Sequence, residues 1–222
     1  MSMNKNYSGP QELPGTISVF PLGGALLLPR ADMPLNIFEP RYLAMVDDAL
    51  RGHRLIGMIQ PLPEASESAR APPLFNVGCV GRITQFAETG DGRIFVVLTG
   101  VTRFRITKEV LAMTQYRQFA VDYEPFISDF TPRAGEDAVD RKAVLAALKM
   151  FARSTNQEID WKSINQAPNE ALVNALSTMS PFGPKEKQAL LEAGDLKTRA
   201  DVLVAITEME MARGGAEGSR VQ

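Results

Sequence analysis

The stretch MPLNIFEPRY, residues 33–42, decides how this chain is expected to fold. Its first half is an apolar extended run, and Glu39-Pro40 then marks the start of an amphipathic helix. Pro40 suits the first helical turn, where its missing N–H is not needed, and Glu39 places a carboxylate at the positive end of the helix dipole. Apolar residues then recur at helical spacing: Tyr42, Leu43, Met45, Val46, Ala49 and Leu50. The stretch therefore predicts a strand that leads directly into a helix ending near Gly52.

Short strand-like runs lie on both sides of this stretch. The sequence Asp91-Gly92 between two of them is a strong signal for a β-hairpin. Six or so short strands separated by turn signals predict a closed or strongly curved sheet, with the one long helix at its end or flank. The expected strands other than residues 33–38 are 16–20, 54–60, 77–86, 93–98, 101–110 and 116–123.

The composition changes after residue 130, where strand patterns stop and helical periodicity begins. The fold class is therefore predicted to be α+β, with a curved β-sheet or pseudo-barrel and one main helix followed by an α-helical bundle. The predicted organisation is a flexible arm (1–14), a β-rich domain (15–130), a helical domain (131–213) and a disordered tail (214–222). The expected helices in the second domain are 138–153, 170–179, 185–193 and 200–212.

Composition excludes several functional classes. The 24 basic and 26 acidic residues give a net charge of −2, which argues against general electrostatic attraction to nucleic acid. A single cysteine, Cys79, excludes an intrachain disulfide and a multi-cysteine zinc site, and a single histidine, His53, excludes two-histidine metal motifs. No apolar run is long enough to span a membrane, and the N-terminal residues do not have a signal-peptide pattern. We therefore expect a cytoplasmic protein without cofactor or metal.

The segment PLNIFEPRY (34–42), preceded by Pro21-Leu22, resembles the signature of the N-terminal substrate-binding domain of Lon proteases. The segments VGRI (80–83), GVTRFR (100–105) and EKQALLE (186–192) are similar to later parts of that domain and occur in the expected order. The resemblance covers residues 15–212 and implies a PUA-like fold in a free-standing bacterial protein. Asn36 departs from the pattern, because the family often has His there.

The resemblance also bears on catalysis. The ATPase and the Ser–Lys peptidase of Lon proteases lie outside the region of resemblance. An ATPase of this type needs a glycine-rich loop ending in Gly-Lys-Ser/Thr, and the chain has no Gly-Lys dipeptide. No serine lies in a G-x-S-x-G elbow either. The sequence therefore predicts a protein that is not an enzyme.

Polypeptide binding is the function that the resemblance implies. The ligand would be an unfolded or extended polypeptide, and the chain would serve as an adaptor or regulator, with a protease or chaperone as a candidate partner; the oligomeric state is left open. Loops cannot easily bury all their apolar side chains, so residues 25–28, Met33 and Leu35 are expected to form a partly exposed cleft. Phe38 and Tyr42 are expected mainly as core aromatics, and Glu39, Pro40 and Arg41 as the structural signature. The candidate peptide-binding residues are Leu26, Leu27, Met33, Leu35, Phe38, Arg41 and Tyr42.

Nucleic-acid binding is the alternative. Arg103 and Arg105 are two residues apart on one strand, so they are expected to project from one face of the sheet. Arg82 and Arg93 lie across the predicted hairpin and could extend this basic face. Acidic residues are close in sequence, and base-stacking aromatic residues are not interleaved. A solvated, ion-paired face is therefore favoured over RNA binding.

Overall fold

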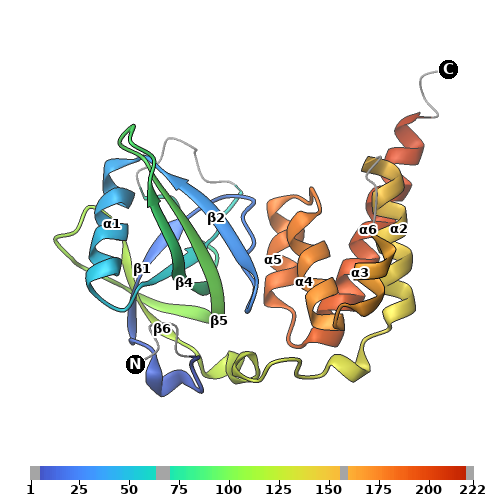
Figure 1. Cartoon of the computed structure of the whole chain (residues 1–222), viewed down its shortest axis with the longest axis horizontal. Helices are drawn as coiled ribbons and strands as arrows, with labels where there is room; N and C mark the ends of the chain where they lie inside the picture. The colour runs from blue at the N-terminus through green and yellow to red at the C-terminus, as the bar shows by residue number, and fades with distance from the viewer. Residues whose placement is uncertain (1–5, 64–70, 156–159, 219–222) are drawn as a thin grey trace. The chain divides into compact units, whose positions relative to one another are not determined.

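The chain forms two compact units, which are described separately below (Figure 1). The computed structural model describes residues 6–63, 71–155 and 160–218. The first unit, here called the β unit, ends at Pro132, and the second, the helical unit, begins at Arg133. The predicted α+β class, with a curved sheet followed by helices, is confirmed.

Six strands make the sheet of the β unit: β1 (Thr16–Pro21), β2 (Asp32–Ile37), β3 (Leu55–Ile59), β4 (Val77–Glu88), β5 (Ile94–Val110) and β6 (Gln118–Asp122). Their order is β2-β5-β4-β3-β1-β6, and β5 also pairs with β6. This extra pairing closes the sheet, while β2 lies outside the closed part, along the first half of β5. The β1–β3 pair is parallel and the other strand pairs are antiparallel.

Strand β5 is a single 17-residue strand, whereas the sequence predicted two strands there. Its first half pairs with β2 and its second half with β6, and β4 runs beside both. Gly100 lies between the two predicted strands. A Cβ at this position would lie only 2.0 Å from the carbonyl oxygen of Leu28. Gly100 is therefore required for the close approach of another segment, not for a turn.

The core of the β unit is built around Phe104, which is fully buried. The ring fits against Gly57 and Gly78 on the neighbouring strands, where a Cβ would lie 3.1 Å and 2.5 Å from it. Val19, Val80 and other apolar residues complete the cluster. Two missing side chains thus create the space for one large aromatic ring.

The prediction of a flexible N-terminal arm over residues 1–14 is wrong for its second half. Residues 10–12 form the 3-10 helix η1 (Pro10–Glu12), Leu13 is buried, and the hydroxyl of Tyr123 donates to the carbonyl of Pro14 at 2.9 Å. Tyr7 lies under the guanidinium of Arg82 at 4.2 Å. The polar composition concealed these contacts, which depend on residues far along the chain. Residues 1–5 lie outside the described part.

The last residues of the β unit pack onto its sheet. The 3-10 segment η2 (Glu124–Phe130) packs on β5 through the side chain of Asp129, which is buried beside Arg103. The backbone oxygen of Asp129 also accepts a hydrogen bond from Arg30 at 2.5 Å. Residues 124–130 are thus an integral part of the first unit.

The helical unit contains η3 (Glu136–Ala138), α2 (Arg141–Thr155), α3 (Trp161–Gln166), α4 (Asn169–Met179), α5 (Pro184–Glu192) and α6 (Leu196–Gly218). Helix α6 packs against α2, α4 and α5, with Leu203 at the centre. Helix α3 was not predicted, and Trp161 on it is 37% exposed. Helix α6 continues to Gly218, so residues 214–218 of the predicted disordered tail are helical; residues 219–222 are not described.

Candidate functional site

The strand–helix junction of residues 37–42 places one aromatic side chain inside the β unit and another outside it. Helix α1 (Pro40–Arg51) begins as predicted. Tyr42 is buried against Phe20, with ring centroids 4.2 Å apart, and this burial raises the pKa of its hydroxyl. Phe38 is 63% exposed, because it follows Ile37, whose side chain points into the core. The expectation that Phe38 is a core aromatic is therefore wrong.

The Glu39 carboxylate lies at the N-terminal end of α1, as predicted. It makes no hydrogen bond to the first turn of α1, although Glu39 is the N-cap residue. Instead it accepts from the guanidinium of Arg41 at 2.9 Å, and Arg41 also lies over the ring of Tyr42 at 4.5 Å. The signature residues Glu39, Pro40 and Arg41 thus form a partly exposed ion pair around the first helical turn.

A groove of about 570 Å³ lies beside this junction, between α1 and the β4–β5 hairpin. Helix α1 buries one face through Tyr42, Met45 and Val46 and turns the next face toward the groove. The groove is lined by Leu43, Ala44, Asp47 and Leu50 from α1 and by Phe86, Glu88, Gly90, Gly92, Arg93 and Ile94 from the hairpin.

The lining of the groove combines apolar and charged side chains. Phe86 is 43% exposed, and the guanidinium of Arg93 lies 5.8 Å from the ring of Phe38. Arg93 is also paired with Asp91 at 3.2 Å, and a hydrogen bond from Thr89 holds the pKa of the Asp91 carboxyl below its usual range. The arrangement offers apolar contacts to a ligand, with charges at its edge.

Several predicted binding residues are buried. Leu26, Leu27 and Met33 have little exposed surface, and the expectation that their loop forms an open cleft is wrong. The loop lies across the bend of β4 and β5, where a Cβ at Gly81 would lie 2.8 Å from the side chain of Leu27. Tyr42 is buried as described above, and Leu35 is half-buried. Of the predicted peptide-binding side chains, Phe38, Arg41 and Leu35 remain at the surface.

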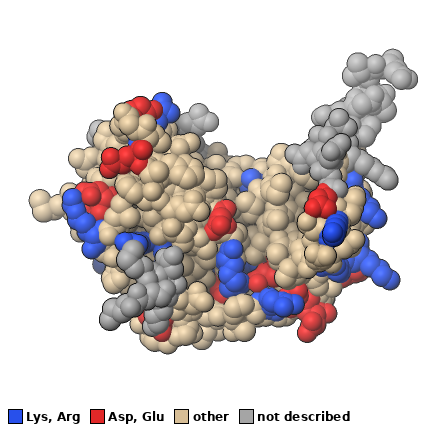
Figure 2. Space-filling model, viewed as in Figure 1, with Lys and Arg blue, Asp and Glu red and all other residues tan. Residues whose placement is uncertain are grey.

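The four arginines of the alternative nucleic-acid site do not share one open face. Arg103 is buried in its pair with Asp129, while Arg105 is exposed, so the two arginines do not form the expected open basic face. Arg82 contacts Tyr7, and Arg93 contacts Asp91 and Phe38. Acidic and basic side chains are interspersed over both units on the face shown in Figure 2.

The family model for the ATP-dependent protease La (LON) substrate-binding domain matches residues 16–208. This match covers both units. The chain belongs to the LON substrate-binding domain family. The resemblance noted in the signature stretch is thereby confirmed over most of the chain.

Curated relatives include a Lon protease of Flavobacterium johnsoniae, 26% identical over 202 residues, which covers 86% of this chain and 23% of the relative. The Lon protease 2 of Myxococcus xanthus is 25% identical over 205 residues and covers 88% of this chain and 24% of the relative. This LON-family chain therefore spans about a quarter of the length of these relatives.

Two solved structures share the fold. The Lon N-terminal domain protein from Xanthomonas campestris has a TM-score of 0.61 at 22% identity and covers 86% of this chain and 97% of that one. The N-terminal domain of the Mycobacterium avium complex Lon protease has a TM-score of 0.63 at 18% identity, with coverages of 87% and 98%. Both likenesses concern the fold.

A second cavity lies in the helical unit of this LON domain. Its volume is about 290 Å³, and it is formed by α2, α3 and α4. Most of its lining is apolar, including Leu148 and Leu176, and α3 contributes Asp160 and Ser163. Sequence analysis could not find this cavity, because it missed α3.

The described residues offer little for metal or redox chemistry. No group of three or more His, Cys, Asp or Glu side chains within the described ranges could hold a metal ion. Cys79 is free and buried in β4. Among the helices of the described ranges, none combines the length and hydropathy needed to cross a membrane.

The sequence predicted the exposed junction only in part and missed the groove. Leu43, Leu50, Phe86 and Ile94 were not candidates. The sequence did contain a signal for Leu43 and Leu50, because the helix after Pro40 has more apolar positions than a single buried face can hold. The hairpin residues had no comparable signal, because their groove position depends on how β4 and β5 fold back beside α1.

Proposed function

We propose that this chain is a non-catalytic module that binds unfolded or extended segments of other polypeptides in the groove between α1 and the β4–β5 hairpin. The single observation that carries the proposal is the groove itself, with an apolar lining and two exposed phenylalanines, Phe38 and Phe86, beside it. The description of the matching family as a substrate-binding domain supports the same function. In the bacterial cytoplasm, such a module would serve as an adaptor or regulator for a protease or chaperone.

The energetics favour weak, side-chain-based binding. Burying one Phe or Leu side chain contributes roughly 1.5–3 kcal/mol, and association itself costs at least about 4 kcal/mol. A groove that accepts two or three apolar side chains therefore supports at most about 5 kcal/mol of net binding, a dissociation constant of roughly 0.1–1 mM. This strength suits a protein that must release many different unfolded segments.

Main-chain pairing at the sheet edge is a weaker contribution. The N–H of Gly100 donates a hydrogen bond to the carbonyl of Ala31, just before β2. In an antiparallel pair every second residue hydrogen-bonds to the partner strand, so Met33, Leu35 and Ile37 hydrogen-bond to β5. The N–H groups of the intervening residues point to the outer edge. Pro34 is one of these residues and has no N–H, which interrupts the edge as a template for a new strand.

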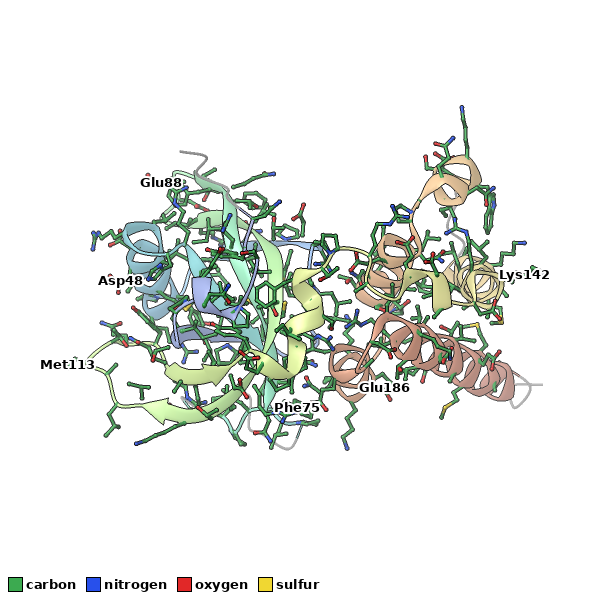
Figure 3. The ribbon with its side chains drawn as sticks, turned by 90° about the horizontal axis from the view of Figure 1, so that it is seen from below. Asp48, Phe75, Glu88, Met113, Lys142 and Glu186 are labelled. Atoms are coloured by element: carbon green, nitrogen blue, oxygen red, sulfur yellow. The ribbon has the colours of Figure 1, made fainter. Side chains whose placement is uncertain are left out.

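The test measures binding of a labelled unfolded protein, reduced and carboxymethylated lactalbumin, by fluorescence anisotropy. The variant Phe38→Ser/Phe86→Ser should weaken binding about tenfold or more, since each lost ring contact is worth roughly 1.5 kcal/mol or more. The matched control is Leu111→Ser/Met113→Ser, which removes two fully exposed side chains from the loop between β5 and β6. Met113 projects from the body of the β unit at the end of this loop (Figure 3).

Equal binding by both variants and the unmodified protein would contradict the proposal. Raised salt should leave binding of the unfolded protein largely intact, because apolar burial is its main source. Labelled RNA in the same assay tests the alternative, since phosphate contacts weaken steeply with salt. Binding of RNA alone, abolished by Arg82→Ala/Arg105→Ala, would favour the nucleic-acid function instead.

A further inference from the structure

We propose that the groove between α1 and the β4–β5 hairpin selects segments in which a Lys or Arg side chain lies next to an apolar one. The inference rests on the proposed function and adds a ligand class to it. Asp47 on α1 and Glu88 on the hairpin both line the groove, one on each wall. Between them lies an apolar surface that includes Leu43, Leu50 and Ile94.

The charges around the groove leave an excess of carboxylate. Arg93 is the one basic residue that lines it within the described chain, and Asp91 already pairs with Arg93 at 3.2 Å. Glu88 makes no ion pair with any residue in the described ranges. The lining of the groove therefore carries two carboxylates, those of Asp47 and Glu88, and one guanidinium, that of Arg93.

The Asp47 carboxylate is available to a ligand despite its neighbour Arg51. Their pair, at 2.7 Å, joins adjacent turns of α1, and the two side chains are 55% and 71% exposed. Ion pairs that are this exposed contribute little, so a basic ligand group can compete for the carboxylate. The negative potential of the groove therefore remains accessible from solvent.

Lysine and arginine side chains match both properties of this surface. Their methylene stems pack along apolar side chains while the charged head stays in water. Such a side chain would lie on Leu43 or Leu50 and reach Asp47 or Glu88 with its head. A ligand carboxylate in the same place would instead meet like charge.

The expected preference is modest and salt-dependent. Exposed charge pairs typically change binding by up to about fivefold each, so two carboxylates should separate basic from acidic ligands by roughly tenfold at low salt. The Debye length falls from about 30 Å at 0.01 M to about 3 Å at 1 M, and the preference should disappear over this range.

The experiment uses three labelled peptides that share one apolar centre and carry flanking Lys, Ser or Glu residues. The whole chain should bind the Lys peptide about tenfold more tightly than the Glu peptide at low salt, with the Ser peptide between them. The variant Asp47→Asn/Glu88→Gln should remove this order, so that the three peptides bind with similar affinity. The control Glu124→Gln/Glu208→Gln removes the same charge from exposed sites outside the groove lining and should keep the order.

The outcomes separate this inference from the proposed function. If the Ser peptide binds and the Lys and Glu peptides bind equally, the charge preference is wrong and the groove function stands. A preference that survives in Asp47→Asn/Glu88→Gln also overturns the inference. If none of the peptides binds, the proposed function fails, and the inference fails with it.

Discussion

Replacing Asp129 with alanine should destabilise the β unit more than any surface charge change. The Asp129 carboxylate accepts from the Arg103 backbone N–H at 2.9 Å, from Nε at 3.0 Å and from Nη2 at 2.8 Å. The two side chains are only 7% and 2% exposed. In Asp129→Ala the guanidinium of Arg103 stays buried, over the ring of Phe126, without this counter-charge.

The expected cost follows from that geometry. Breaking a buried ion pair by removing one partner costs about 3–5 kcal/mol, because a buried charge is left uncompensated. For a unit of this size the loss corresponds to a fall in melting temperature of roughly 10–20 °C. Asp47→Ala breaks an exposed ion pair in the same unit and should lower the free energy of unfolding by only about 0–1 kcal/mol.

Unfolding should be followed separately in the two units. Trp161, the single tryptophan, reports on the helical unit, whereas near-UV circular dichroism of the tyrosines and hydrogen exchange in β5 report on the β unit. A loss below about 1 kcal/mol in Asp129→Ala would refute the reasoning. The pair Arg103→Met/Asp129→Leu should recover most of the loss, which separates the unpaired charge from the missing hydrogen bonds.

Two further predictions concern packing and pH. Gly78→Ala should destabilise the β unit by about 1–3 kcal/mol in urea unfolding, because its Cβ would lie 2.5 Å from the ring of Phe104, whereas Gly15→Ala, which meets nothing within 4 Å, should be nearly neutral. In the helical unit a hydrogen bond from Arg133 holds the pKa of the Glu136 carboxyl below its usual range. The stability that this carboxylate contributes is therefore present above the unfolded pKa of about 4.3 and is lost as the pH falls below it. Glu136→Gln should make the stability of the helical unit depend less on pH in this range, as measured by acid unfolding followed with Trp161 fluorescence. An unchanged pH dependence of stability in the variant would contradict this assignment.

Local patterns were sufficient for most elements of the fold. The helix after Pro40 and the hairpin at Asp91-Gly92 depend on capping, periodicity and turn chemistry within a few residues, and both form where the sequence predicts them. The two halves of β5 were separated in the prediction, with Gly100 between them. Only the approach of the Leu28 carbonyl, from far along the chain, shows why glycine is needed there.

The binding residues were harder to predict, because exposure depends on partners far away in the sequence. Arg103 and Arg105 are two residues apart on one strand and so belong to the same face. Arg103 is nevertheless buried by Asp129, which lies 26 residues further along the chain. Leu26 and Leu27 were expected at the surface, yet the bend of β4 and β5 provides a core for them. Both errors come from treating a loop or strand as if nothing packed over it.

The exposure of Phe38 connects the fold to the proposed function. Ile37 is buried before it and Tyr42 after it, so the strand–helix junction leaves Phe38 no inward direction. A polar side chain would satisfy the same backbone without exposing a phenyl ring to water. An aromatic residue here is therefore better explained by contact with a ligand, and its neighbour Arg93, from the hairpin that lines the groove, places that contact at the groove rim. The signature stretch thus fixes the register through its buried residues and leaves Phe38 exposed beside the proposed binding groove.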